Sequence, residues 1–443
     1  MNDEPRAGGG PFAALAAPNF RLFYVAFLVG TIGTQLLFAA TLWQIYELTE
    51  SPLHLGLTGL ARAAPIILLS LAGGLVADRV DRVKFMALTQ GLSGALPFAL
   101  AALTATGLID VWHIYVITFL SSVLQAISSP ARIALTPSLV PRQHLLNAIA
   151  LGSTVYQGAN IIGPAIGGAG IAAFGLTATY LANGVAHVLS LGAMALIRVP
   201  PVPAIPEESP LQSLRDGLSF VRGRSIIFVM LLMDTAATLL GSYRTLVPII
   251  AVNLGYGAEG MGLLLAAPGV GSLLGSGSIL ALGDVRYKGW YVIGGILAYC
   301  AALVLLGLSP WFGASIIAAG LLGFFDSVQM IPRNTAIQAM TPDGLRGRVS
   351  SFQMTFSGGA PAVGQATSGV LAAIVGAPLA LVLGAASCAA VIVGFAFARG
   401  DLRERDLGET QAEETSSATP GRGLRDAAGA PVFPPRPSAQ TPL

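Results

Sequence analysis

Long apolar stretches separated by short polar turns fill this chain from about residue 22 to residue 398. Each stretch holds roughly 20 or more residues, the length that an α-helix needs to cross the hydrocarbon core of a bilayer. The pattern therefore predicts an all-α membrane protein with twelve transmembrane helices. These are expected at residues 22–46, 55–77, 85–107, 111–135, 147–173, 176–197, 226–254, 258–282, 289–308, 313–340, 350–375 and 378–398.

The basic residues collect in alternate loops between the predicted helices. Arg6, Arg21, the cluster from Arg79 to Lys84 and the later groups that end at Arg399 share one side. The loops on the other side, including those around Glu50 and Asp110, contain no Lys or Arg. Because cytoplasmic loops of membrane proteins are enriched in these residues, both termini are predicted to be cytoplasmic, in a multi-pass protein of the cell inner (plasma) membrane.

The longest internal loop divides the body into two halves. It opens with the residues PPVPAIP, a composition that favours an extended linker. The tail after the last apolar stretch is rich in Glu, Thr, Ser, Gly and Pro, which predicts disorder. The expected organisation is a cytoplasmic tail (1–19), an N-terminal six-helix bundle (20–198), a cytoplasmic linker (199–224), a C-terminal six-helix bundle (225–398) and a disordered cytoplasmic tail (399–443).

Short sequence patterns recur in the two halves. The tripeptide AAP at 63–65 reappears at 266–268, and PAIG at 164–167 returns as PAVG at 361–364. The two offsets are both close to about 200 residues, and the matches fall in corresponding helices, as expected of the duplicated halves that transporter folds contain. The two bundles are therefore expected to be pseudo-symmetric.

Composition restricts the class of protein further. The chain is 54% hydrophobic and 10% charged, with a mean hydropathy of +0.72, which excludes a soluble globular protein. The net charge of +2 is uninformative about nucleic acid, and no nucleic-acid partner is expected. We expect no cofactor, no metal and a monomer. Cys300 and Cys388 lie in apolar stretches and are interpreted as buried core residues rather than as a disulfide.

A charged hairpin loop between the second and third apolar stretches carries the most specific motif. Its pattern G-x-x-x-D-R-x-x-R resembles the signature loop between the second and third helices of major facilitator superfamily transporters. The loop departs from the family pattern at Asp81, where a second glycine is usual, and at Val83, where a basic residue is usual. An acidic residue at the first of these positions is typical of the enterobactin exporter branch. The motif residues are Gly74, Asp78, Arg79 and Arg82.

The resemblance covers nearly all of residues 20–398 and also extends to the drug–proton antiporters of the superfamily. It implies the major facilitator fold, in which two bundles rock about a central cavity lined by the first, fourth, seventh and tenth helices. It also implies that Asp78 and the neighbouring arginines form a conformational gate on the cytoplasmic side.

Charges inside apolar stretches are informative, because burying one in hydrocarbon is costly unless it faces a partner, a cavity or water. Asp234 and Asp326 lie roughly 13 Å and 20 Å from the ends of their predicted helices, near the midplane. Burial disfavours a charged carboxylate, so such a residue can exchange a proton near neutral pH. We interpret Asp234 and Asp326 as the candidate proton-coupling residues. Static pairing with a nearby arginine is the alternative.

Several other polar residues are candidates for the substrate cavity. Asp326, Gln329 and Arg333 are spaced to share one helix face. Arg62 and Arg244 are placed to hold an anionic substrate such as a catecholate or carboxylate, to extend toward the interface, or to neutralise an aspartate. Tyr46 fits an interfacial aromatic belt as well as a substrate contact.

A glycine-rich element in the fifth apolar stretch resembles the Gly-Pro-x-x-Gly-Gly motif of antiporters in the superfamily. Small residues allow helices from opposite halves to approach closely. The element favours export, although plain close packing explains the same residues. It comprises Gly163, Pro164, Gly167 and Gly168.

These observations predict a secondary active transporter that exports a small amphipathic molecule, siderophore or drug-like, from the cytoplasm by proton antiport. Import of a small metabolite by the same fold is the main alternative. An intramembrane protease is a remote one, suggested by the sequence GLSG at 91–94 with His187 as a conceivable base. No Gly-Lys-Ser or Gly-Lys-Thr phosphate loop occurs, which disfavours ATP-driven transport. We therefore do not expect an enzyme.

Overall fold

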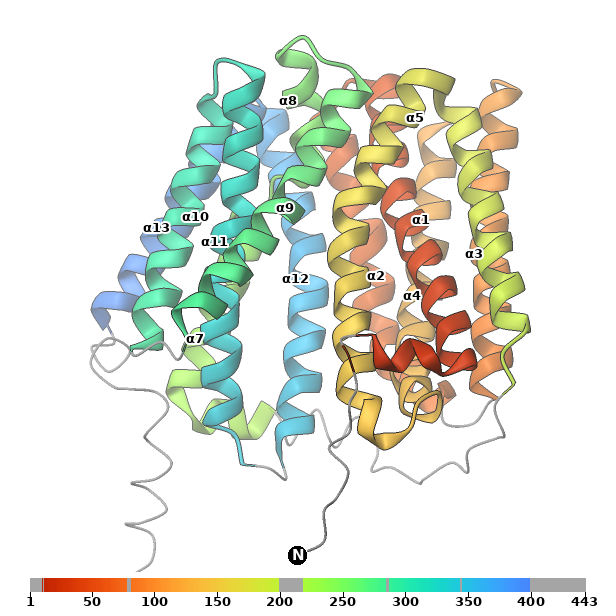
Figure 1. Ribbon diagram of the computed structural model, residues 1–443. Helices are drawn as coiled ribbons and strands as arrows, with labels where there is room; N and C mark the ends of the chain where they lie inside the picture. The colour runs from red at the N-terminus through yellow and green to blue at the C-terminus, as the bar shows by residue number, and fades with distance from the viewer. Residues whose placement is uncertain are drawn as a thin grey trace, which may run out of the picture.

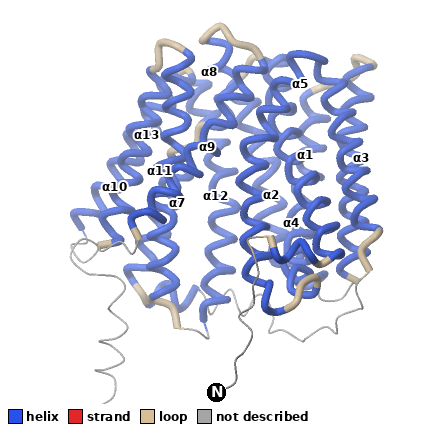
Figure 2. Tube along the Cα trace, in the orientation of Figure 1, coloured by secondary structure: helices blue, strands red, loops and turns tan. Residues whose placement is uncertain are grey.

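The computed structural model describes residue 10 and residues 12–77, 81–198, 218–283, 287–342 and 345–398. Figures 1 and 2 show that these residues form helices joined by short loops, with no strand among them. The helices are η1 (Ala13–Ala16), α1 (Pro18–Thr49), α2 (Pro52–Ala77), α3 (Arg82–Ala105), α4 (Val111–Leu135), η2 (Thr136–Ser138), η3 (Arg142–His144), α5 (Leu145–Ala195), α7 (Ser225–Leu240), η4 (Arg244–Leu246), α8 (Val247–Asn253), α9 (Ala258–Leu282), α10 (Lys288–Leu308), α11 (Phe312–Ala339), α12 (Arg346–Val375) and α13 (Ala377–Ala398).

Two of these elements depart from simple single crossings. Helix α5 is interrupted at Gly175, whose φ of 79° lies in the left-handed region that glycine tolerates, so its 51 residues fold back and cross twice (Figure 1). The seventh predicted span is divided into α7, η4 and α8. With these two adjustments the described helices account for the twelve predicted crossings.

The helices form two bundles. In the first, α1 and α3 pack on α5, and α2 packs on α4. In the second, α11 packs on α9 and α10, and α13 packs on α7, α10 and α12. Two pairs, α2 with α12 and α5 with α9, make the most extensive contacts between the bundles. This is the arrangement predicted from the duplicated sequence.

Large apolar side chains cover the outside of the described helices. Leu280, Phe174 and Leu68 are 84%, 78% and 71% exposed, whereas Tyr180 and Phe20 are fully buried inside the first bundle. A soluble protein does not expose apolar surface on this scale, and hydrocarbon chains of a bilayer would cover it. The protein is a multi-pass membrane protein.

Glycines create two equivalent crossings between the bundles. A Cβ on Gly262 of α9 would lie 2.6 Å from the Pro164 carbonyl oxygen of α5. A Cβ on Gly59 of α2 would lie 2.3 Å from the Ala362 carbonyl oxygen of α12. Pro164 and Ala362 belong to the repeated PAIG and PAVG segments, and Gly59 and Gly262 each lie four residues before a repeated AAP segment. The internal duplication therefore appears in the structure as a pair of related helix contacts.

The two crossings lie toward the same end of the molecule. Helix α1 begins and helix α13 ends at the opposite end of the molecule, in the lower part of Figure 1. The end that carries the two crossings is called the remote end below. The glycine contacts between the bundles run from Gly56 and Gly369 near the remote end to Gly359 and Ile67 near the middle. The structure is therefore the form in which the bundles are closed at the remote end.

Two predicted boundaries need correction. Residues 218–223 were predicted to belong to the linker but are helical, because Val221 inserts a fully buried side chain into the core. Ala14 was predicted to lie in the N-terminal tail, yet it is buried and its backbone N–H donates to Asn147 Oδ1 (2.9 Å). The remainder of the linker, residues 199–217, and the C-terminal tail, residues 399–443, lie outside the described residues.

Candidate functional site

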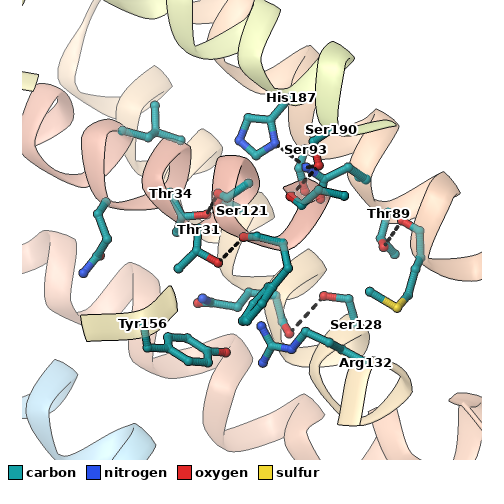
Figure 3. Close-up of a pocket in the computed structure, with 18 of the residues that line it drawn as sticks. Thr31, Thr34, Thr89, Ser93, Ser121, Ser128, Arg132, Tyr156, His187 and Ser190 are labelled. Atoms are coloured by element: carbon teal, nitrogen blue, oxygen red, sulfur yellow. Dashed lines mark hydrogen bonds between the residues drawn. The ribbon is translucent and has the colours of Figure 1, made fainter. Parts of the chain in front are cut away.

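A cavity of about 350 Å³ runs along the inner face of the first bundle (Figure 3). Its wall is rich in hydroxyl and amide groups and also includes aromatic rings and arginines. It extends from Phe23 and Met194, near the end that carries the termini, to Arg62 and Arg244 in the middle of the molecule. The lining polar residues include Thr31, Thr34, Gln35, Thr89, Gln90, Ser93, Ser121, Gln125, Ser128, Asn160, His187 and Ser190. Such a wall suits an amphipathic small molecule.

Arg62 and Arg244 meet at the deep end of this cavity. The guanidinium carbon of Arg62 lies 4.6 Å from the centroid of the Phe38 ring, and that of Arg244 lies 5.1 Å from the same centroid. Arg62 belongs to α2 of the first bundle and Arg244 to η4 of the second. Both residues are substrate-cavity candidates from the sequence, and both lie in the wall of this cavity.

The break in the seventh span places Arg244. A Cβ on Gly241 would lie 2.5 Å from the Ala237 carbonyl oxygen, so only glycine fits where α7 ends. Pro248 lies in the first turn of α8, and the freed Gly241 carbonyl accepts a hydrogen bond from Tyr299 Oη (2.9 Å). Discontinuous helices of this kind are typical of transporter binding sites.

A third arginine lines the cavity closer to the terminal end. The Arg132 guanidinium stacks over the rings of Phe27 (4.6 Å) and Tyr156 (5.1 Å), and it donates to Ser129 Oγ (3.2 Å). The sequence shows its charge but does not reveal that α1 and α5 contribute aromatic partners. Figure 3 shows Arg132 and Tyr156 on one side of the cavity and His187 on the other.

His187 belongs to a hydrogen-bond network that sequence reasoning did not connect. Its Nδ1 pairs with Gln90 Nε2 (2.8 Å), which also donates to Ser190 Oγ (2.9 Å), and Ser190 donates to the Ala26 carbonyl (2.8 Å). Ser93 lines the same cavity, but the hydrogen-bonding partner of His187 Nδ1 is Gln90. The serine–histidine pair required of an intramembrane protease is therefore not assembled among the described residues.

The two candidate proton-coupling aspartates have different surroundings. Asp234 of α7 is 7% exposed and forms an ion pair with Arg333 of α11. Arg333 Nη1 also donates to Gln329 Oε1 (2.9 Å), and Gln329 Nε2 donates to Asp326 Oδ1 (3.1 Å). The predicted polar stripe on α11 is thus a connected chain. It ends in an exposed carboxylate at Asp326 and a buried one at Asp234.

The row of hydrogen-bonded side chains from Asp326 to Asp234 approaches the deep end of the cavity. Tyr243, which precedes Arg244, interacts electrostatically with both Arg244 and Asp326. Gln329 and Arg333 themselves lie inside the second bundle rather than on the cavity wall. Tyr46 does not line this cavity either, and packs against Trp43 with ring centroids 5.9 Å apart near the remote end of α1.

The structure describes only part of the charged hairpin. Gly74 lies in the last turns of α2, whereas Asp78 and Arg79 lie outside the described residues. Arg82 begins α3 and donates to the Ala134 carbonyl of α4 (3.2 Å). Asp81, which replaces the usual glycine, caps α3 by accepting the backbone N–H groups of Val83 (3.0 Å) and Lys84 (3.2 Å).

The glycine-rich element of α5 faces two partners. A Cβ on Gly163 would lie 2.5 Å from Gln35 Cβ of α1, and Gly167 also packs on α1. A Cβ on Gly168 would lie 2.8 Å from Gly262 Cα of α9, in the opposite bundle. The element therefore packs α5 tightly within its own bundle and across the boundary between the bundles.

Comparison with known proteins identifies the family. A family model described as "transmembrane secretion effector", of the major facilitator superfamily, matches residues 9–423. The chain belongs to this family. Members of the major facilitator superfamily are transporters and not enzymes, and this transporter fold accounts for the two bundles and the cavity described above.

The individual relatives of this major facilitator protein share under a third of its sequence. The chain is 27% identical to the enterobactin exporters of Shigella boydii and of Escherichia coli, over 81% of its length and 86% of theirs. Among solved structures, it resembles the nucleoside transporter NupG with a TM-score of 0.67 at 11% identity, covering 86% of this chain and 98% of that one. A bacterial homologue of the lysosomal transporter Spinster gives a TM-score of 0.67 at 13% identity, covering 89% of this chain and 97% of that one.

Proposed function

We propose that this transporter exports a small amphipathic molecule, siderophore or drug-like, from the cytoplasm by proton antiport. The observation that carries the proposal is the cavity that runs from the terminal end to a deep end walled by Arg62 and Arg244, in a form closed at the remote end. With cytoplasmic termini, as the loop charges predict, this is the form that takes up a cytoplasmic substrate. The relatives named as enterobactin exporters support the same direction.

The proton would be carried by the carboxylates of the second bundle. Asp326 is exposed and hydrogen-bonded only to Gln329 among the described contacts, so it is accessible for protonation. Asp234 is held by Arg333. Because Tyr243 interacts electrostatically with both Asp326 and Arg244, protonation of Asp326 changes the potential at the deep end of the cavity. We therefore propose Asp326 as the first candidate for the coupling residue and Asp234 as the second.

Import of a small metabolite is the alternative, because the same fold and the same cavity serve both directions. The experiment is uptake into everted and right-side-out membrane vesicles, with a panel of siderophores and drugs and with vesicles lacking the protein as the control. Export by antiport predicts accumulation in energised everted vesicles that a protonophore abolishes. Accumulation confined to right-side-out vesicles would establish import instead.

A further inference from the structure

The deep end of the cavity holds two positive charges that form no ion pair with the described residues. Neither Arg62 nor Arg244 forms an ion pair with a described residue, whereas Arg333 in the second bundle is paired with Asp234. Both guanidinium carbons lie within 5.1 Å of the Phe38 centroid, and the two groups interact electrostatically with each other. Like charges held this close repel each other, and an anion bound between them would relieve that repulsion.

The two arginines come from opposite bundles. Arg62 is on α2, and Arg244 is on η4, which packs on α2 and α12. Their approach therefore depends on closure of the remote end, where Gly56 and Gly59 of α2 contact α12. When the bundles separate at that end, the two guanidinium groups must move apart.

We propose that Arg62 and Arg244 together bind the negative group of an aromatic organic anion, a carboxylate or catecholate, and that this anion holds the bundles closed at the remote end. A guanidinium presents a planar fork of donors that matches a planar anion. Phe27 and Tyr156 supply aromatic surface along the same cavity, and Thr31 and Thr34 supply hydroxyl groups. The substrate class is thus an anionic aromatic molecule.

This inference rests on the proposed function and gives it a release step. In the form closed at the remote end, both arginines contact the anion, so affinity is high where the substrate enters. Opening of the remote end removes one of the two cations, so affinity falls where the substrate leaves. A ligand shifts a conformational equilibrium only by its differential affinity for the two states, and this geometry supplies that difference.

The first test measures binding by the purified full-length protein in detergent, at constant ionic strength. Benzoate is the probe, and benzamide is its neutral analogue of the same shape. We expect benzoate, and not benzamide, to raise the midpoint of thermal unfolding with saturation. R62Q and R244Q should each weaken benzoate binding at least tenfold. R142Q, which removes an exposed arginine of η3 outside the cavity, should bind benzoate as the unaltered protein does.

The second test measures the effect of the anion on conformation. Spin labels at Thr106→Cys and Ser309→Cys, in the loops at the remote end of each bundle, report their separation in a background lacking Cys300 and Cys388. Benzoate should increase the population with the short distance, and R244Q should abolish this response. Arg62→Lys keeps the charge without the planar fork and should bind with intermediate affinity, which covers the case in which R62Q fails to fold.

The inference is overturned if benzamide binds as tightly as benzoate or if R62Q and R244Q bind benzoate unchanged. Such a result leaves export standing, provided that the vesicles described above still accumulate a neutral substrate. Conversely, the protein could bind benzoate saturably in detergent and transport none of the tested substrates in everted vesicles. That combination would refute the export proposal and support the anion site.

Discussion

Arg333 of α11 donates a hydrogen bond to Asp234 of α7, and this ion pair joins two helices of the second bundle across 99 positions of sequence. The side chains are only 4% and 10% exposed. Gln329 accepts a further hydrogen bond from the same nitrogen of Arg333 at 2.9 Å. The pair therefore holds α7 against α11 just before α7 breaks at Gly241.

Asp234→Asn should destabilise the protein strongly, because the buried guanidinium of Arg333 loses its carboxylate. Removing one partner of a buried ion pair typically costs about 3–5 kcal/mol. The measurement is the midpoint of thermal unfolding in detergent. The double variant Asp234→Asn with Arg333→Gln should recover most of the loss, since no buried charge remains. A single variant as stable as the unaltered protein would contradict the role assigned to this pair.

Asp326→Asn should abolish gradient-driven export while leaving the fold intact. An asparagine keeps an oxygen that accepts from Gln329 but cannot release a proton. Exchange requires alternating access without net proton movement, so substrate counterflow in proteoliposomes should persist. If the Asp326→Asn and Asp234→Asn variants both still concentrate substrate, and a protonophore still collapses that gradient, proton coupling lies at another site.

Gly168→Val should hinder closure of the remote end. The added Cβ would lie 2.4 Å from the Ala258 carbonyl oxygen and 2.8 Å from Gly262 Cα, both in the opposite bundle. We expect slow transport and a longer distance between spin labels at the remote end. Gly158→Val is the matched control on the same helix, because a Cβ there meets nothing within 4 Å. Equal effects of the two substitutions would show that general destabilisation of α5, and not the inter-bundle contact, is responsible.

The predicted orientation places Ser309 outside and Ser350 inside the cell. Ser309 follows α10, and Ser350 lies in the first turns of α12. Single-cysteine variants in a background lacking Cys300 and Cys388 should react with an impermeant reagent on intact cells at position 309 and not at position 350. The reverse labelling would place the termini outside and would remove the directional argument for export.

Sequence reasoning alone found the helices, the duplication and several site residues. The length of an apolar stretch is a local property, and the bilayer thickness converts it directly into a crossing. The fold-back near residue 175 was predicted from the boundary between the fifth and sixth apolar stretches, and Gly168 was singled out because a close helix contact needs a small residue. Arg62 and Arg244 were found because a charge in an apolar stretch is conspicuous.

Only the tertiary structure decided which of these side chains meet. In a membrane helix both the lipid-facing and the buried faces are apolar, so periodicity does not reveal which face points inward. The convergence of Arg62 and Arg244 on Phe38, the network of His187 with Gln90, and the pairing of Asp234 rather than Asp326 with Arg333 all depend on helix rotation and packing. Likewise, the seventh predicted span was apolar throughout 226–254, and its break at Gly241 became apparent only from the close approach of Tyr299. The sequence by itself determined the membrane crossings and the side-chain chemistry available within them. The packing of the two bundles determined which side chains form the site, because contacts between distant helices are set by shape and not by hydrophobicity.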